Sequence, residues 1–279
     1  MPVINTNKSA LTAANALTAN ERVMQKTMQK LSTGSRINSS ADDAAGLAIR
    51  ENMTSQINGL NAAVRNANDG INLLQTADGA MSSISEMMQR MREVAVLATN
   101  DTYSSAQKSA MNDEFQALSN QINLVATTTQ WNKMGLTTGA GGELGGSGKM
   151  TFQVGANAGQ AITVSVGNAA TSGFLSDISG ASIGTAGAAS SAIANIDNAL
   201  SALNANRSAI GAGVNRLEHA INNLTNIAQN TTDARSRVAD TDYSKATSDL
   251  ARQQIIQQAG TAMLAQANQQ PASVLALLR

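Results

Sequence analysis

Proline is confined to the two ends of this chain, and that placement limits its fold more than any other feature. The sequence has 279 residues and 2 prolines, Pro2 and Pro271, so the long interior lacks the residue that most strongly breaks helices. Apolar residues in that interior recur at alternating steps of four and three, the spacing of helices that pack along their lengths. This spacing runs from Met53 to Leu74, from Met81 to Ala95 and from Met111 to Val125. The pattern predicts long helices, the last of them an antiparallel return after a break near residues 100–102.

The second half of the chain repeats this pattern. Between Ile196 and Leu224 the steps of four and three return, interrupted only by Arg207, whose stem can pack while its charged head reaches solvent. The middle differs in kind, because 13 of the 22 glycines lie between residues 139 and 187. Within it, apolar and polar residues alternate over 150–154 and 162–166 around a turn-like stretch, which predicts a β-hairpin. The predicted fold is therefore mainly α: a long antiparallel helical bundle or coiled coil formed by both termini, with a small β-hairpin region.

Each end of the chain carries a weaker amphipathic helix. Ordering about forty residues costs on the order of 40–80 kcal/mol of backbone entropy, which a lone helix in water does not recover. The two ends must therefore pair with each other, pair with other copies, or stay disordered. Their apolar residues are Leu17, Met24, Met28 and Leu31 in the first helix, and Leu250, Ile256, Met263 and Leu264 in the last.

Two polar joints, at residues 34–43 and 239–243, separate the end helices from the central ones. In the first, Ser40 followed three positions later by Asp43 resembles a capping box. The acidic pairs of the joints, Asp42 with Asp43 and Asp240 with Asp242, could form a metal site or an acid pair. Helix-start and turn chemistry explains them better. The matching depth of the joints from each end suggests two layers of helices, each built from both termini.

Composition excludes several classes of function. The formal net charge is zero, from 19 basic and 19 acidic residues, so there is no basic excess to neutralise nucleic-acid phosphates. With no cysteine and one histidine, disulfides, thiol nucleophiles and multi-histidine metal sites are excluded. The chain has no apolar run of membrane-spanning length, and its start lacks the basic and apolar regions of a cleaved signal peptide. We therefore expect no nucleic-acid partner, no membrane insertion, no cleaved signal and no cofactor.

The remaining chemical motifs have structural explanations. The glycine-rich run at 139–150 lacks the first glycine and the Ser/Thr of a phosphate loop, so we interpret it as a surface loop. His219 lies off the apolar seam and is expected to face solvent, and Trp131 is interpreted as a packing anchor. The methionines at 81–91 are interpreted as core. The polar residues of Gln89–Val96 point away from that seam, as on a solvated helix face. No enzyme active site is predicted.

Several independent motifs, in the same order, resemble those of bacterial flagellin over essentially the whole chain. The resemblance implies an inner tube of paired terminal helices, from residues 1–42 and 240–279. It implies an outer tube from residues 43–239, with the glycine-rich hairpin segment at about 135–190. The chain resembles a short flagellin that has only these two domains. The motifs are Val3–Asn7, Leu31–Ser39, Ala41–Ile49, Gln89–Val96, Ala239–Tyr243 and Val274–Arg279.

The resemblance implies a structural subunit that polymerises into the flagellar filament for swimming. Such a subunit is extracellular, leaves the cell through the flagellar type III pathway and adds to the filament beneath a cap protein. Its partners would be other flagellin copies, the cap and junction proteins and an export chaperone. Self-assembly would rest on apolar residues of the terminal helices: Leu17, Met24, Met28, Leu31, Leu250, Ile256, Met263, Leu264, Leu277 and Leu278.

The resemblance also implies that the free monomer is recognised by a Toll-like innate immune receptor of the host. The contacts carried over by motif are Gln89, Arg90 and Glu93, with Glu114 on the adjoining helix. Three alternatives stay open. A hook–filament junction protein shares the terminal helices, a chemoreceptor-type signalling module shares the coiled coil, and an enzyme would need a convergent polar set.

Overall fold

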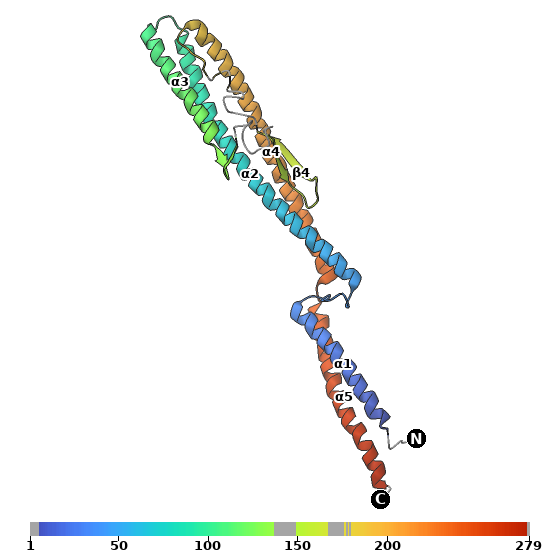
Figure 1. Cartoon of the computed structure of the whole chain (residues 1–279). Coiled ribbons are helices and arrows are strands. Elements are labelled where there is room, and N and C mark those ends of the chain that lie inside the picture. The colour runs from blue at the N-terminus through green and yellow to red at the C-terminus, as the bar shows by residue number, and fades with distance from the viewer. Residues whose placement is uncertain (1–5, 137–148, 167–175, 177, 179, 278–279) are drawn as a thin grey trace. The chain divides into compact units, whose positions relative to one another are not determined.

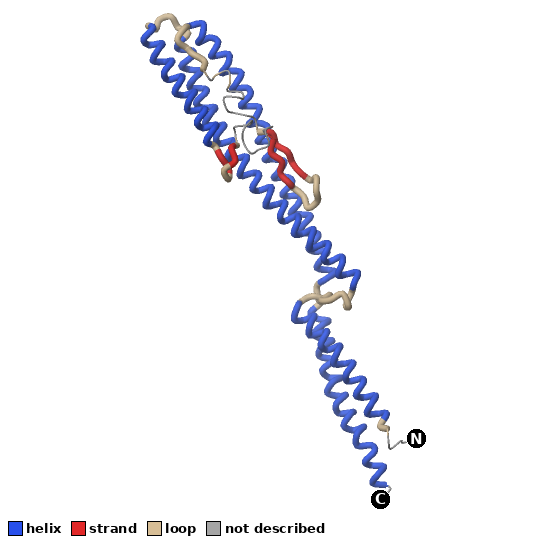
Figure 2. The backbone as a smooth tube through the Cα atoms, viewed as in Figure 1, coloured by secondary structure: helices blue, strands red, loops and turns tan. Residues whose placement is uncertain are grey.

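The structure, a computed structural model, describes residues 6–136, 149–166, 176, 178 and 180–277, with side chains placed as far as residue 269. Helices dominate it (Figure 1), and the strands are short (Figure 2). This architecture confirms the predicted mainly α fold with a small hairpin. The elements are α1 (Lys8–Thr33), α2 (Ala44–Ala98), α3 (Ser105–Thr128), β1 (Gln130–Trp131), β2 (Met134–Gly135), β3 (Lys149–Gln153), β4 (Ala161–Ser165), α4 (Ala186–Ala239) and α5 (Tyr243–Leu277).

The first helix after the polar joint, α2, begins later than the sequence suggested. Its N-cap is Asp43, whose Oδ1 accepts a hydrogen bond from the backbone N–H of Gly46 at 2.9 Å. The predicted capping box starting at Ser40 is wrong, because the helix begins at Ala44 and Ser40 lies in the preceding turn. At the second joint, Asp242 Oδ1 accepts from the N–H of Lys245 at 3.1 Å. Helix-start chemistry therefore explains one acidic residue at each joint.

The α2–α3 break falls where the sequence predicted it, between residues 99 and 104. A capping box begins α3: Ser104 Oγ accepts from the N–H of Gln107 at 3.3 Å, and Gln107 Oε1 accepts from the N–H of Ser104 at 2.9 Å. The sequence contains the Ser-x-x-Gln signature of this box. The predicted start of this helix rests on the break in the apolar pattern alone, without use of this signature.

The chain forms two compact units, one of residues 1–57 and 229–279 and the other of residues 58–228. One boundary between the units falls inside α2 and the other inside α4. The predicted domain boundaries fell instead at the polar joints, residues 34–43 and 239–243. The assignment of residues 1–42 and 240–279 to an inner tube, and of 43–239 to an outer tube, stays a prediction.

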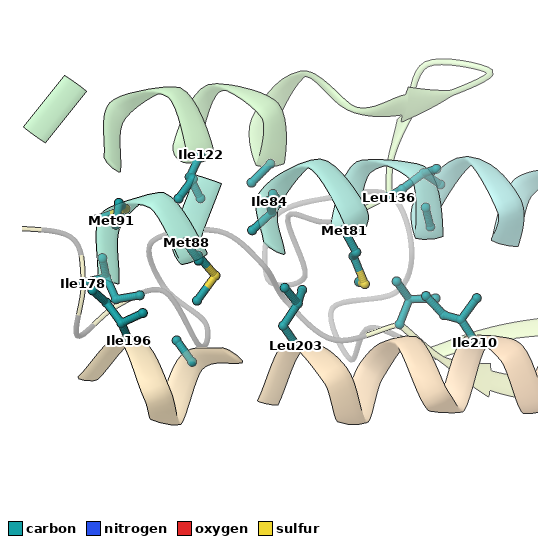
Figure 3. Close-up of a cluster of buried hydrophobic side chains, with 14 of the residues drawn as sticks. Met81, Ile84, Met88, Met91, Ile122, Leu136, Ile178, Ile196, Leu203 and Ile210 are labelled. Atoms are coloured by element: carbon teal, nitrogen blue, oxygen red, sulfur yellow. The ribbon is translucent and has the colours of Figure 1, made fainter. Parts of the chain in front are cut away.

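The core of the second unit lies between α2, α3 and α4. Figure 3 shows side chains of α2 filling the space between its two neighbouring helices. Met81, Met88 and Met91 have no exposed surface, which confirms their interpretation as core residues. Other fully buried members are Leu74, Ile84, Phe115, Ile183, Ile196 and Leu203.

Two ion pairs across α2 and α4 fix the antiparallel register of these helices. Arg92 Nε lies 2.7 Å from Asp197 Oδ1, and Arg207 Nε lies 2.9 Å from Asp78 Oδ1. The sequence suggested that the charged head of Arg207 reaches solvent. In the structure it pairs instead with an acidic side chain of the facing helix, Asp78. The hydrogen bond from Arg92 lowers the pKa of Asp197.

Strands β3 and β4 form the hairpin that alternation predicted over 150–154 and 162–166. They pair antiparallel, with Met150 opposite Val164 and Phe152 opposite Ile162. Met150 and Val164 are each 4% exposed and belong to the core of the second unit. The hairpin therefore covers the helices with its apolar face.

Two helix glycines allow this close approach. A Cβ on Gly70 of α2 would lie 2.8 Å from Cδ1 of Phe152, and one on Gly213 of α4 would lie 2.7 Å from Cγ2 of Val164. Since any other residue would place an atom there, these positions need glycine for space rather than for an unusual backbone angle.

The other motifs that the sequence raised have structural outcomes. His219 is exposed, and Trp131 is half-buried against the core, as expected. Most of the glycine-rich run lies outside the described residues. Within the ranges that the structure describes, no helix has both the length and the apolar character needed to span a membrane. The same ranges contain no cluster of three His, Asp or Glu side chains able to hold a metal ion.

Candidate self-assembly surface

The two end helices pack on each other within one chain. Helices α1 and α5 run antiparallel side by side, so the start of α1 and the end of α5 lie at the same end of the pair (Figure 1). Two side-chain amides bridge them: Asn20 Nδ2 donates to the carbonyl of Gln253 at 2.9 Å, and Asn7 Nδ2 donates to the carbonyl of Ala267 at 2.7 Å. Of the possibilities that the sequence left open for the ends, the structure shows pairing with each other.

Two of the three most buried residues in the contact seam of this pair are polar. In the ranges with described side chains, the residues of α1 and α5 that are buried are Thr27, Ala246 and Gln253, at 9%, 8% and 9% exposure. Polar residues at core positions of a helix pair lower its stability while favouring one register. The seam is formed by Leu17, Asn20, Met24, Thr27 and Leu31 of α1 and by Ala246, Leu250, Gln253, Gln257, Gly260 and Leu264 of α5.

Large apolar side chains lie on the outside of the same pair. There are six of them, given at the end of this paragraph, and we call them the outer apolar residues. Burying such side chains against another protein removes apolar surface from water, so we treat these six residues as a candidate contact with another protein. The outer apolar residues, with their exposed fractions, are Leu11 (68%), Val23 (49%) and Met28 (53%) of α1 and Ile255 (66%), Ile256 (48%) and Met263 (62%) of α5.

The predicted assembly residues fall into two groups in the structure. Leu17, Met24, Leu31, Leu250 and Leu264 are half-buried on the intrachain seam, whereas Met28, Ile256 and Met263 are outer apolar residues. Leu277 is the last residue of α5 and its side chain is not described, and Leu278 lies outside the described residues. Sequence reasoning missed Leu11, Val23 and Ile255, whose only signal is a large apolar side chain off the main stripe.

The two polar joints meet in space and hydrogen-bond. Ser35 and Asp240 form an antiparallel β-bridge. The backbone N–H of Arg36 donates to the carbonyl of Ala239 at 2.6 Å, and its guanidinium Nη2 donates to the carbonyl of Val238 at 2.6 Å. These bonds satisfy carbonyls that the end of α4 leaves without helical partners.

Packing fixes the same joint. Ile37 is 1% exposed, and a Cβ on Gly46 would lie 2.6 Å from Cδ1 of Ile37. The guanidinium of Arg50 donates to the carbonyl of Ile37 at 2.6 Å. The hydroxyl of Tyr243 donates to the carbonyl of Leu31 at 3.1 Å, which ties the start of α5 to the end of α1.

The carboxylate of Asp42 makes this joint sensitive to acid. The backbone N–H of Asn38, then Lys26 and Ser39, lower the pKa of Asp42 by hydrogen bonding its charged form. A lowered folded-state pKa adds stability above the ordinary pKa of about 3.9, and this stability is lost as the pH falls through the folded-state value. We expect Asp42→Asn to destabilise the chain at neutral pH and progressively less below about pH 4.

Thermal unfolding followed against pH tests this expectation. Asp113→Asn, at an exposed position of α3, is the control. A stability difference between Asp42→Asn and the wild type that stays constant across the acid range would contradict it.

Gln253 lowers the stability of the α1–α5 helix pair. Its Oε1 is buried and, within the described part of the chain, has no hydrogen-bond partner. A buried unpaired acceptor costs about 1–3 kcal/mol, so Gln253→Leu should stabilise the pair by about 1 kcal/mol or more. Hydrogen exchange in α1 and α5 should slow about fivefold or more. The exposed change Gln254→Leu is the control, and equal exchange in both variants would refute the expectation.

The four residues predicted for receptor contact lie together on one surface of α2 and α3. Arg90 Nη2 lies 2.9 Å from Glu114 Oε1, and its Nη1 lies 3.0 Å from Glu93 Oε2. Hydrogen bonds that Arg90 donates to Glu114 and Glu93 raise the pKa of Arg90. Gln89 is exposed beside them. The arrangement is a solvent-exposed, charged surface with both signs present.

An open groove of about 570 Å³ lies along this surface. Gln89, Arg92 and Glu93 supply its polar lining, and Val96 and Leu97 supply its apolar lining. Val96 is 45% exposed and Leu97 is 44% exposed. A lining that combines apolar and polar side chains suits contact with another protein.

Comparison with known protein families assigns both ends of the chain to one group. The family described as "Bacterial flagellin N-terminal helical region" matches residues 4–140, and "Bacterial flagellin C-terminal helical region" matches residues 193–278. A flagellin of Halalkalibacterium halodurans is 43% identical over 277 residues, covering 99% of this chain and 100% of that protein. The "Flagellar filament 33 kDa core protein" of Treponema phagedenis is 39% identical over 285 residues, with 99% and 100% coverage.

Solved structures agree on the fold. The crystal structure of Bacillus cereus flagellin matches with a TM-score of 0.50 and 27% identity, covering 61% of this chain and 94% of that one. A putative flagellar hook-associated protein from Vibrio parahaemolyticus matches with a TM-score of 0.58 and 13% identity, covering 71% and 100%. At that identity the second likeness concerns the fold alone.

Proposed function

The chain belongs to the bacterial flagellin family, and from this premise we propose that it is the structural subunit of a flagellar filament and polymerises through its terminal helix pair. The observation that carries the proposal is the burial of α1 and α5. Their shared seam holds Asn20, Thr27 and Gln253, while the six outer apolar residues stay in solvent. The seam holds these polar groups beside apolar ones, and large apolar groups outside it stay in solvent, so burying the outer groups against another protein would be favourable.

Other copies of the same chain are the proposed partners of the outer apolar residues. Fully burying a large aliphatic side chain contributes about 1.5–3 kcal/mol, so six partly exposed ones offer several kcal/mol per subunit. The zero net charge of the chain lowers repulsion between copies. Contacts that join one face to a different face of the next copy produce a helical polymer when the rotation between copies does not close into a ring.

The finer functional assignments follow from filament assembly. As a filament subunit the protein acts outside the cell, leaves it through the flagellar type III pathway, and transmits rotation for swimming. Its proposed partners include the cap and junction proteins and an export chaperone. Its role is mechanical rather than catalytic. Family membership and whole-length similarity to a filament core protein support these assignments.

Seeded elongation tests the proposal. Purified subunits are added to filament fragments, and growth is followed by electron microscopy beside a truncation that lacks residues 245–279. We expect the full chain to elongate seeds indefinitely and the truncation to stay in solution. Growth that stops after a few copies would favour the alternative, a hook–filament junction protein. A full chain that stays monomeric, with both ends protected from proteolysis, would refute polymerisation and favour a signalling module.

We further propose that the free subunit is read by a Toll-like innate immune receptor through the surface of Gln89, Arg90, Glu93 and Glu114. The ion-paired geometry of these residues supports the proposal, because it gathers charges of both signs on one exposed surface that a partner of complementary charge can match.

Arg90→Asp tests receptor recognition. The change removes both ion pairs and places three acidic groups together, so we expect receptor signalling to fall about thirtyfold or more, as at an interface hot spot. Arg65→Asp, a charge reversal at another exposed position of α2, should leave signalling unchanged. An unchanged response to Arg90→Asp would remove this surface from the proposal.

A further inference from the structure

Within the described side chains, exposed methionine is restricted to the terminal helix pair. Among the methionines whose side chains the structure describes, Met28 and Met263 are exposed, at 53% and 62%, and the others are buried or half-buried. Both belong to the outer apolar residues. We propose that Met28 and Met263 are sites of oxidative modification, and that their conversion to methionine sulfoxide by a peroxide blocks addition of the subunit to a filament. This inference rests on the proposed function.

The chemistry needs only access to sulfur. A lone pair of the thioether sulfur attacks one oxygen of hydrogen peroxide, the O–O bond breaks and an S–O bond forms. Proton transfer to the departing oxygen releases one water, so the sulfur is oxidised by two electrons and the peroxide is reduced by two. The product is a polar sulfoxide, and methionine sulfoxide reductases reverse the change.

The free chain can carry this modification without unfolding. Met28 follows the buried seam residue Thr27, Met263 precedes the half-buried Leu264, and both methionines are themselves exposed. The sulfoxide oxygen at either site therefore stays in water while the chain is free. When a second copy covers the site, that oxygen loses water without gaining a fitted donor, so the cost falls on association alone.

The core methionines provide an internal contrast. Met81, Met88 and Met91 have no exposed surface, so peroxide reaches them only when the second unit opens. Brief peroxide treatment should therefore separate the two groups. Covering of Met28 and Met263 by neighbouring copies should also protect them in the filament.

The experiment combines limited peroxide treatment of free full-length subunits, peptide mass spectrometry, and seeded elongation before and after treatment. We expect Met28 and Met263 to be oxidised about tenfold faster than the core methionines. We expect the elongation rate to fall about tenfold or more, with recovery after methionine sulfoxide reductase treatment. In assembled filaments both sites should resist the same treatment.

Two variants identify the responsible residues. Peroxide should not slow elongation by the Met28→Leu/Met263→Leu chain. Its elongation rate after peroxide treatment, relative to the rate before, should match the same ratio for a mock-treated sample. The matched Met87→Leu/Met111→Leu chain, changed at half-buried methionines of the second unit, should lose elongation as the wild type does.

The outcomes separate this inference from the function on which it rests. Subunits oxidised at Met28 and Met263 that elongate normally would overturn the inference and leave filament assembly intact. A Met28→Leu/Met263→Leu chain still blocked by peroxide would also overturn it. Untreated subunits that never elongate seeds would overturn the proposed function itself.

Discussion

Replacing Ile255 and Ile256 of α5 by aspartate should abolish seeded filament elongation while α1 and α5 still pair. Both side chains are exposed, at 66% and 48%, so the change leaves the intrachain seam untouched. In a filament the two carboxylates would be buried against apolar groups of other copies. Burying an unpaired charge costs several kcal/mol, so we expect elongation to slow on the order of a hundredfold or more.

Electron microscopy and light scattering of seeded samples measure the effect. The exposed neighbour Gln254→Asp adds one of the same charges beside them and should elongate at a rate close to that of the wild type. Circular dichroism of the free variant should match the wild type in helix content. Normal elongation by the Ile255→Asp/Ile256→Asp chain would exclude these positions from the assembly surface.

Adding a single methyl group at Gly213 should destabilise the second unit, although alanine is the better helix former. The new Cβ would lie 2.7 Å from Cγ2 of Val164, which is 4% exposed and has no room to move. Overpacking of this kind costs about 1–3 kcal/mol, which exceeds the propensity gain of about 0.5–1 kcal/mol. Gly70→Ala on α2 should act in the same direction, because its Cβ would meet the ring of Phe152 at 2.8 Å.

The same helices supply matched controls for these two changes. A Cβ on Gly211, two residues before Gly213 on α4, or on Gly79 of α2 would meet no atom within 4 Å apart from its chain neighbours and the backbone of its own helix. Gly211→Ala and Gly79→Ala should therefore stabilise the chain by about 0.5–1 kcal/mol through helix propensity alone. Denaturant unfolding of the four variants should give opposite signs within each pair. Equal signs would show that the hairpin is not seated on Gly70 and Gly213.

Sequence periodicity predicted the central fold because it reports burial against neighbours in the same chain. The steps of four and three correspond to α2, α3 and α4, and the alternation at 150–154 and 162–166 corresponds to β3 and β4. These patterns are visible in the sequence because each buried apolar residue there packs against a fixed partner in the same chain. The break before α3 was predictable for the same reason, since the pattern stops where the helix leaves the core.

Local motifs were less informative where several polar residues compete for one role. Ser40 and Asp43 both suit a helix start, and only the course of the turn before Ala44 makes Asp43 the cap. Arg207 was expected to reach solvent, and its partner Asp78 lies 129 positions away in sequence. A partner so distant in sequence becomes apparent only when α2 and α4 lie side by side.

The candidate assembly surface divides in the same way. The sequence by itself determined that both ends are helical and that they carry apolar residues such as Leu17, Met28 and Met263. It also determined, through motif order, the family resemblance. Only the tertiary structure decided which of these residues lie between α1 and α5 and which remain outside. The reason is that the seam contains the polar residues Asn20 and Gln253, and the side-chain amide of Asn20 donates a hydrogen bond to the backbone carbonyl of Gln253. Hydrophobicity along the sequence therefore does not identify the buried face of either helix.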